Sequence, residues 1–251
     1  MTRPFVFAWH FLTAIPISRQ HHVPTAQELA ASMAWYSTVG LLIGGLTVLA
    51  DYGLRSWVTA EVGNTLLIVL LVLLTRGLHQ DGLADTVDGL GGGRTVEDRL
   101  RIMRDPRVGA FGATALFLSL LLRYAGLLAL PSTLRLPVLL CMPALGRWAM
   151  VSLAWASPSA RREGGLAASF LTHLSWQHVM LSSLVLGAAL TITLGGSAVV
   201  ATMGMGILVV VLIRQRCLAL FGGVTGDVLG ATNELVEILF LLSIPVLVMA
   251  R

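Results

Sequence analysis

The stretch Ala198-Val-Val-Ala-Thr-Met-Gly-Met-Gly-Ile-Leu-Val-Val-Val-Leu-Ile213 contains no charged residue. Its length approaches the ~20 apolar residues that a helix needs to cross the hydrocarbon core of a bilayer. Six further apolar segments accompany it, at Ala34–Ala50, Val62–Leu78, Val108–Leu130, Leu136–Ala156, Val179–Leu194 and Leu235–Met249. Several are short for a full span, which indicates polar residues at their ends or discontinuous helices. The sequence predicts an all-α, polytopic integral membrane bundle with about seven transmembrane helices.

The composition of the 251-residue chain favours the same class. Hydrophobic residues make up 56% of it and charged residues only 12%, whereas soluble domains carry roughly 25% charged residues. No polar stretch is long enough for a separate soluble domain, so residues 1–251 are expected to form one membrane-embedded domain. The apolar segment Phe5–Ile17 is too short to cross and is interpreted as an interfacial or re-entrant element. Gly40-Leu-Leu-Ile-Gly44 is a G-x-x-x-G pattern, which allows close helix packing.

The arginines, which supply all 17 basic residues, indicate the orientation of the chain. When the loops are numbered alternately, one side receives the N-terminal segment and residues 79–107, 157–178 and 215–234. That side carries Arg3, Arg19, Arg94, Arg99, Arg101, Arg104, Arg107, Arg161, Arg162 and Arg216. The other side receives little beyond Arg55, Arg135 and Arg251. The positive-inside rule predicts that the arginine-rich side faces the cytoplasm.

An acidic cluster lies in His79-Gln-Asp81-Gly-Leu-Ala-Asp85-Thr-Val-Asp88. Positions i, i+4 and i+7 share one face of a helix, so the three aspartates would repel one another unless a cation lies between them. Carboxylate oxygens suit hard cations such as Mg²⁺. A solvated acidic face is the usual explanation in soluble proteins, but here six of the 13 acidic residues fall between Asp81 and Asp105. The cluster therefore predicts Mg²⁺ ligands at Asp81, Asp85 and Asp88.

Glycines and arginines follow this cluster. Gly91 and Gly92 belong to a glycine-rich run that could direct backbone N–H groups at a phosphate, although such runs are more often flexible turns. Arg94, Arg104 and Arg107 could bind diphosphate oxygens bidentately. Anchoring to anionic lipid explains these arginines equally well, and both alternatives stay open.

A second polar island, from Gly222 to Glu237, lies near the C-terminus. Asp227, Glu234 and Glu237 interrupt or border apolar sequence, where carboxylates are costly and usually functional. The loop numbering brings this island to the side of the first cluster. It adds Asp227 as a fourth metal ligand and Thr225 as a phosphate-binding residue, since metal-diphosphate sites are assembled from separate motifs in this way.

Three polar side chains lie inside or beside the apolar segments. Intramembrane arginines are functional candidates, which makes Arg147 a candidate for phosphate binding. Arg123 is a similar candidate, but snorkelling to an interface explains it as well. His79 could act as a base or a ligand, although a structural hydrogen bond is the more common role of such a histidine.

Three motifs of the chain resemble the cobalamin synthase family, whose members are adenosylcobinamide-GDP ribazoletransferases. They are His79-x-Asp-Gly-Leu-Ala-Asp-Thr-x-Asp-Gly89, Leu100-x-Ile-Met-Arg-Asp105-x-x-x-Gly109-x-x-Gly112 and Gly222-Gly-x-Thr-Gly-Asp-x-Leu-Gly-Ala231-x-x-Glu-x-x-Glu237. Weaker marks are Phe11-Leu-Thr-x-Ile-Pro16 and Ala160-Arg-Arg-Glu-Gly164. The chain departs from the family pattern at Pro106, where serine is usual, at Arg101, where an acidic residue is common, and at Gly165, which looks like an insertion.

The resemblance implies transfer of the cobinamide phosphate group from adenosylcobinamide-GDP to α-ribazole or its 5′-phosphate, with release of GMP. It also implies Mg²⁺ and a bacterial inner (cytoplasmic) membrane location, with the active site on the cytoplasmic side. No nucleic-acid partner is expected, and a homo-oligomer or an association with other enzymes of the pathway stays open. In this interpretation Arg104 stabilises the leaving group, and the general base is Glu234, Glu237 or His79.

Other classes of protein stay open on the residues alone. CDP-alcohol phosphotransferases and membrane prenyltransferases also use Asp-rich motifs with Mg²⁺, but the former expect arginine where this chain has Asp85. A cation transporter would place its carboxylates near mid-membrane and often show internal repeats. Here the carboxylates cluster at the ends of loops and spans, and no repeat is visible.

Overall fold

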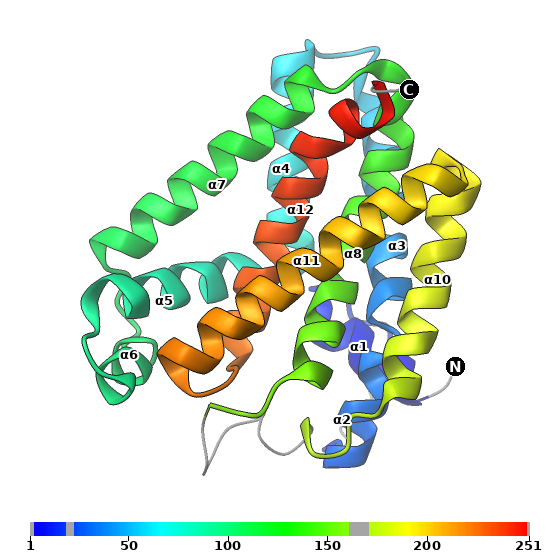
Figure 1. Ribbon diagram of the computed structural model, residues 1–251. Coiled ribbons are helices and arrows are strands. Elements are labelled where there is room, and N and C mark those ends of the chain that lie inside the picture. Colours follow the sequence, from blue (N-terminus) through cyan, green and yellow to red (C-terminus); the bar gives the residue numbers. More distant parts are fainter. Residues whose placement is uncertain (1–2, 19–22, 161–170, 250–251) are drawn as a thin grey trace.

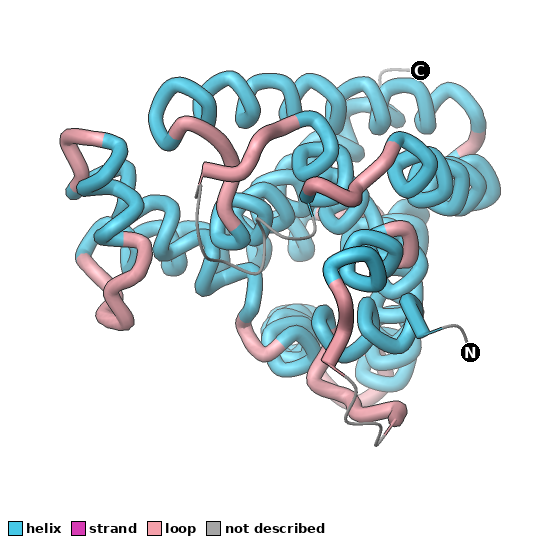
Figure 2. Tube along the Cα trace, turned by 90° about the horizontal axis from the view of Figure 1, so that it is seen from below, coloured by secondary structure: helices cyan, strands magenta, loops and turns pink. Residues whose placement is uncertain are grey.

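The computed structural model describes residues 3–18, 23–160 and 171–249, and nearly all of them are helical (Figure 1). Helices and loops are the only elements in the Cα trace of these residues (Figure 2). The only strand-like contact within them is an isolated bridge between Ser159 and Val224. The predicted all-α class is confirmed.

Within the described residues, six helices are long and apolar enough to cross a membrane. They are α3 (Tyr36–Leu54), α7 (Ala110–Ala129), α8 (Ser132–Ala156), α10 (Trp176–Leu194), α11 (Gly196–Phe221) and α12 (Gly226–Met249). A seventh candidate span consists of two helices, α4 (Ala60–Thr75) and α5 (Leu78–Gly92), which meet at a bend of 87°. The remaining helices are short: α1 (Arg3–Leu12), α2 (Ala26–Met33) and α6 (Val96–Ile102). The prediction of about seven spans is confirmed.

The bend between α4 and α5 is an elbow formed by Arg76 and Gly77. Both residues adopt left-handed backbone conformations, with φ angles of 55° and 66°. The α4 helix has 16 residues, which span about 24 Å at 1.5 Å per residue and fall short of a ~30 Å hydrocarbon core. The predicted span Val62–Leu78 therefore ends early, and the acidic motif forms a separate helix that runs across the direction of α4.

The central helix is α8, which packs against α3, α10, α11 and α12 and is largely enclosed by them. The glycine pattern on α3 lets that helix approach closely. A Cβ atom at Gly44 would lie 2.1 Å from the carbonyl oxygen of Leu140, and one at Gly40 would lie 2.4 Å from the Cα of Ala144. The close packing predicted from G-x-x-x-G is confirmed.

This contact gives a test with a matched control one residue away. Gly44→Ala is expected to destabilise the protein by about 1–3 kcal/mol, because the added methyl group overlaps the backbone of α8. Gly45→Ala meets nothing within 4 Å and should be neutral or stabilising by up to about 1 kcal/mol, since alanine favours a helix. Thermal unfolding of both variants in one detergent measures the difference; equal midpoints would contradict the packing described for α3.

The ends of the helices separate into two groups (Figure 1). The lower end carries α1, α2, α6 and the start of α12, together with the C-terminal ends of α8 and α11. The upper end carries the short connections that precede α4, α8 and α11. The segments predicted to share a face therefore lie at one end. Arg19, Arg161, Arg162 and Arg251 lie outside the described residues.

The upper end is held by a polar cluster around Asp51 of α3. This carboxylate is buried, and it accepts hydrogen bonds from Arg55 one turn later and from Arg135 of α8, whose Nη2 lies 2.7 Å away. Arg135 also donates to the side chain of Asn64 on α4, at 2.6 Å. Arg135 thus connects α3, α4 and α8, and Arg55 adds a second cation beside Asp51.

Candidate active site

The two acidic motifs meet where α5 crosses the first turns of α12. A Cβ atom at Gly82 would lie 2.6 Å from the backbone oxygen of Asp227. On the α12 side, a Cβ atom at Gly230 would lie 3.4 Å from the Cα atoms of both Gly82 and His79. Glycine at these positions allows the two backbones to touch. The predicted meeting of distant acidic motifs is therefore seen in the fold.

The start of α12 differs from the prediction. The last span was expected at Leu235–Met249, but the helix begins at Gly226. The Thr225 hydroxyl stabilises this start, because it accepts a hydrogen bond from the Val228 N–H and donates one to Asp227. Thr225 is therefore engaged as a helix cap. Asp227 lies in the first turn, and Glu234 and Glu237 lie inside the helix.

The three aspartates of α5 have different environments. Asp81 is exposed, and its carboxylate makes no hydrogen bond or ion pair with any residue in the described ranges. Asp85 is partly buried. Asp88 is buried and accepts the N–H groups of Gly109 and Gly112 at 2.7 and 2.8 Å. Asp88 therefore caps the N-terminus of α7, where a carboxylate also complements the helix dipole.

These positions can be tested against the ligands that Mg²⁺ prefers. Among the described residues, no three His, Cys, Asp or Glu side chains are close enough to hold a metal ion by themselves. Mg²⁺ is usually held by one or two carboxylates together with waters and substrate phosphates. Asp81 and Asp85, one turn apart on α5, fit such a partial set of two carboxylates, and Asp227 lies on the helix that contacts α5. Asp88 fits it poorly, because both of its oxygens are already bonded to backbone N–H groups.

The predicted glycine loop after the cluster is wrong. Gly91 and Gly92 are the last two residues of α5, so their N–H groups point along a helix axis instead of outwards from a loop. Their small size serves packing. A Cβ atom at Gly91 would lie 2.5 Å from the Phe111 ring, and one at Gly92 would lie 3.1 Å from Ile102. The predicted phosphate contacts of Gly91 and Gly92 receive no support from this backbone.

An open recess of about 790 Å³ lies between the end of α5, α6 and the start of α7. We call it the arginine recess, because Arg101, Arg104 and Arg107 line it beside Asp88. Arg107 binds Asp105 at 2.8 Å and lowers the pKa of that carboxyl to about 2, so the pair stays ionised at neutral pH. Arg104 is exposed and unpaired within the described residues, which suits it to bind an anion.

Two other arginines of this segment do not line the arginine recess. Arg94 follows α5 directly and is exposed, without a partner among the described residues. Arg99 instead turns towards α11 and donates to the carbonyl oxygen of Leu220, at 3.0 Å. A cation near a helix C-terminus complements the helix dipole, so Arg99 has a structural role.

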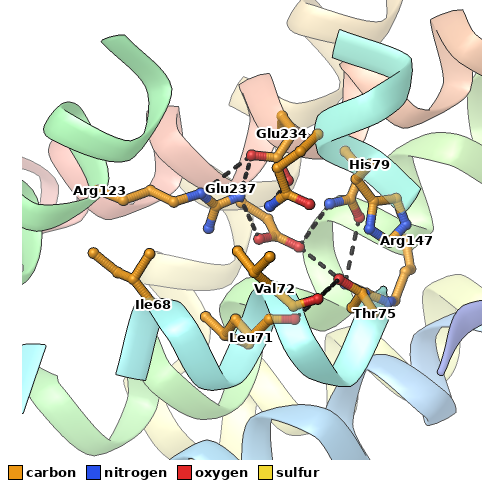
Figure 3. A pocket seen from close by; sticks show the side chains of 11 residues that line it. Ile68, Leu71, Val72, Thr75, His79, Arg123, Arg147, Glu234 and Glu237 are labelled. Atoms are coloured by element: carbon orange, nitrogen blue, oxygen red, sulfur yellow. Dashed lines mark hydrogen bonds and ion pairs between the residues drawn. The ribbon is translucent and has the colours of Figure 1, made fainter. Parts of the chain in front are cut away.

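Four charged side chains form a buried ionic network beside the acidic site (Figure 3). Arg123 of α7 lies 3.0 Å from Glu234 and 2.8 Å from Glu237, and Arg147 of α8 lies 2.9 Å from Glu237. All four are at most 4% exposed. Gln80 of α5 donates to Glu234 at 3.2 Å. The network carries no net charge and ties α5, α7, α8 and α12 together.

The ionic network changes the roles expected for its members. Glu234 and Glu237 were predicted as general bases, but Arg123 and Gln80 already bind the oxygens of Glu234, and Arg123 and Arg147 bind those of Glu237. The adjoining cavity measures only about 10 Å³, which is room for roughly one water. His79 is buried at this cavity too. A positioning role fits these three residues better than proton transfer to a large substrate.

The two arginines of the ionic network also depart from the prediction. Arg147, expected to bind phosphate, is 1% exposed and lies away from the arginine recess. The snorkelling interpretation of Arg123 is wrong, since that residue is buried between two carboxylates. The position of Arg123 inside an apolar span is the sequence feature that indicates a buried ion pair, because an unpaired charge is expensive there.

Comparison with known proteins supplies the identity of these motifs. A family model described as cobalamin-5-phosphate synthase matches residues 4–245. The adenosylcobinamide-GDP ribazoletransferase of Syntrophobacter fumaroxidans is 39% identical over 92% of this chain and 96% of its own length. Those of Chlorobium phaeobacteroides and Desulfitobacterium hafniense are 37% and 38% identical, over 94% and 96% of this chain and 95% of their own lengths. No solved structure matches the chain.

The match extends over almost every element described above, from α1 to α12. It includes the α5 motif, the segment that caps α7 and the glycine-rich start of α12. The chain therefore belongs to the cobalamin-5-phosphate synthase family, a family of membrane-embedded transferases of cobalamin biosynthesis.

Proposed function

We propose that this chain transfers the cobinamide phosphate group of adenosylcobinamide-GDP to α-ribazole or α-ribazole 5′-phosphate. The products are adenosylcobalamin, or its 5′-phosphate, and GMP. The observation that carries the proposal is the contact of α5 with α12 at Gly82, which brings Asp227 to the helix of Asp81 and Asp85. The names of the relatives supply the substrate class.

The reaction breaks a phosphoanhydride bond of the donor and forms a phosphodiester with the acceptor. A ribose hydroxyl of the acceptor attacks the phosphorus nearer the corrinoid, the bond from that phosphorus to the bridging oxygen breaks, and GMP leaves with that oxygen. Phosphoryl transfer depends mainly on positioning and on stabilising negative charge. Arg104, with Arg94 and Arg107 nearby, would hold the diphosphate in the arginine recess. Mg²⁺ held by one or two of the carboxylates Asp81, Asp85 and Asp227 would neutralise phosphate charge.

We further propose that the lower end faces the cytoplasm in a bacterial inner membrane. The location of the arginines supports this orientation. In the described residues, α6 with its flanking loops carries most of the loop arginines, and the positive-inside rule places arginine-rich loops on the cytoplasmic side. The apolar outer faces of α10 and α11, with exposed residues such as Leu184 and Ile207, would contact lipid.

The function is tested with purified protein in detergent or in lipid vesicles. Incubation with adenosylcobinamide-GDP, α-ribazole or its 5′-phosphate, and Mg²⁺ should release GMP, measured by chromatography. Release should require the acceptor, which distinguishes transfer from hydrolysis. Parallel incubations with a CDP-alcohol or a prenyl diphosphate should give no product. Turnover of one of those substrates, or no GMP under any condition, would argue against the proposal.

A further inference from the structure

A second recess lies on the other side of the crossing between α5 and α7, with a volume of about 490 Å³. We call it the elbow recess, because the bend between α4 and α5 forms one wall. Its lining combines apolar side chains with one cation and one carboxylate: Arg76, Leu78, Asp81, Ala84, Val108 and Leu116. The elbow recess is thus smaller than the arginine recess, and fewer charged side chains line it.

The two recesses are neighbours with different chemistry. Val108 lines both of them. The arginine recess carries three arginines, which suits a diphosphate, whereas the elbow recess carries a single arginine among apolar walls. Asp81 lines the elbow recess and Asp88 lines the arginine recess, so α5 contributes a carboxylate to each. An enzyme that joins a donor to an acceptor needs two adjacent compartments of this kind.

Arg76 is placed in the elbow recess by an unusual backbone. It is the only non-glycine residue with a positive φ among the described residues, a conformation that costs roughly 1–2 kcal/mol for a residue with a Cβ. Its Nη2 donates to the backbone oxygen of His10 at 2.8 Å, which leaves most of its five N–H donors available. This conformation ends α4, since the N–H groups of Arg76 and Gly77 donate to the carbonyl oxygens of Leu73 and Val72, and it fixes the place of Arg76 at the corner of the elbow recess.

We propose that the elbow recess binds the acceptor nucleotide and that Arg76 binds its 5′-phosphate. The inference rests on the proposed function and names the residue that would distinguish phosphorylated from unphosphorylated ribazole. The apolar walls at Leu78, Ala84 and Leu116 suit a flat aromatic base. Arg76 suits a phosphomonoester because its planar fork can donate two parallel hydrogen bonds.

The position of Asp81 agrees with an acceptor whose 5′-phosphate lies at Arg76. The 5′-phosphate and the attacking hydroxyl lie at opposite ends of a ribose. With the phosphate at Arg76, the hydroxyl end would face Asp81 and, beyond it, the arginine recess that would hold the donor. The acceptor hydroxyl would thus approach the diphosphate from the elbow recess, and in-line displacement requires the leaving oxygen of GMP to lie on the far side of the attacked phosphorus.

The test compares two acceptors on one set of variants. Arg76→Gly removes the guanidinium at a position where glycine adopts the left-handed conformation freely, so the elbow is not strained by the change. Its kcat/KM for α-ribazole 5′-phosphate is expected to fall roughly 10- to 100-fold, as for loss of hydrogen bonds to a charged group. Its kcat/KM for unphosphorylated α-ribazole should stay unchanged. Arg76→Lys should keep part of the preference for the phosphorylated acceptor over α-ribazole.

Each outcome bears on one claim. Arg216→Gln changes an exposed arginine of α11 outside both recesses and is the control. It should leave kcat/KM for both acceptors unchanged. An equal loss with both acceptors in Arg76→Gly overturns the inference, and so does no loss with either. If the loss also varies with the anionic lipid content of the vesicles, Arg76 binds a lipid headgroup phosphate. Absence of GMP in the wild-type protein would refute the proposed function itself.

Discussion

Asp85→Asn is expected to lower GMP release by roughly 100- to 1,000-fold or more, the size of effect seen when a group that stabilises transition-state charge is removed. Asp85 is partly buried on α5, one turn after Asp81 and on the helix that contacts Asp227. Asparagine has nearly the same shape, so the helix should be preserved. It lacks the negative charge that would attract Mg²⁺.

The control for this variant is another aspartate of the same end of the protein. Asp98 lies on α6, and its Oδ1 forms a surface ion pair with Nη2 of Arg101 at 3.4 Å. Asp98→Asn should leave GMP release within about twofold of wild type, because exposed ion pairs contribute little. Circular dichroism and thermal unfolding check that both variants fold. Turnover at the wild-type rate in Asp85→Asn would refute the proposed carboxylate site.

Glu237→Gln is expected to destabilise the protein by about 3–5 kcal/mol, since removal of one member of a buried ion pair leaves an uncompensated charge. Glu237 accepts from Arg123 with one oxygen and from Arg147 and Asn233 with the other. Glutamine keeps the shape, so the loss would report charge and not packing. Thermal or chemical unfolding in detergent measures it.

Two further variants separate charge balance from position. Glu97→Gln, at an exposed site on α6, should change stability by no more than about 0.5 kcal/mol. The double variant Glu237→Gln/Arg147→Gln removes one charge of each sign and should recover part of the loss. If the double variant is as unstable as the sum of its single changes, the two side chains are not coupled and the ionic network is wrongly described.

The spans, and which loops share one end of the bundle, could be predicted because hydropathy is a local property of the chain. The segments that became α8 and α11 were recognised from their apolar residues alone, and the alternation of loops followed from the number of crossings. The elbow could not be recognised in this way. Apolar residues continue through Leu74 and resume at Leu78, and only the backbone shows that the chain turns by 87° at Arg76 and Gly77.

Partners of polar side chains were harder to predict than the side chains themselves. Helical spacing correctly put the three aspartates on one helix, but it could not show that Asp88 would be bonded to Gly109 and Gly112. The same holds for Glu237, whose arginine partners are 90 or more residues earlier in the chain. Such pairings depend on helix packing, and one sequence contains no direct record of it.

The ionic network has a consequence for how the chain is made. Its two arginines lie on α7 and α8, and both of its carboxylates arrive later, on α12. An arginine at the centre of an inserting helix costs about 2.5–3.5 kcal/mol on insertion scales. While the ribosome is still translating α10 and α11, both cations therefore lack their counter-ions. The buried charges of α7 and α8 are therefore neutralised only once α12 has been made, and a chain that ends before α12 leaves both arginines without these counter-ions.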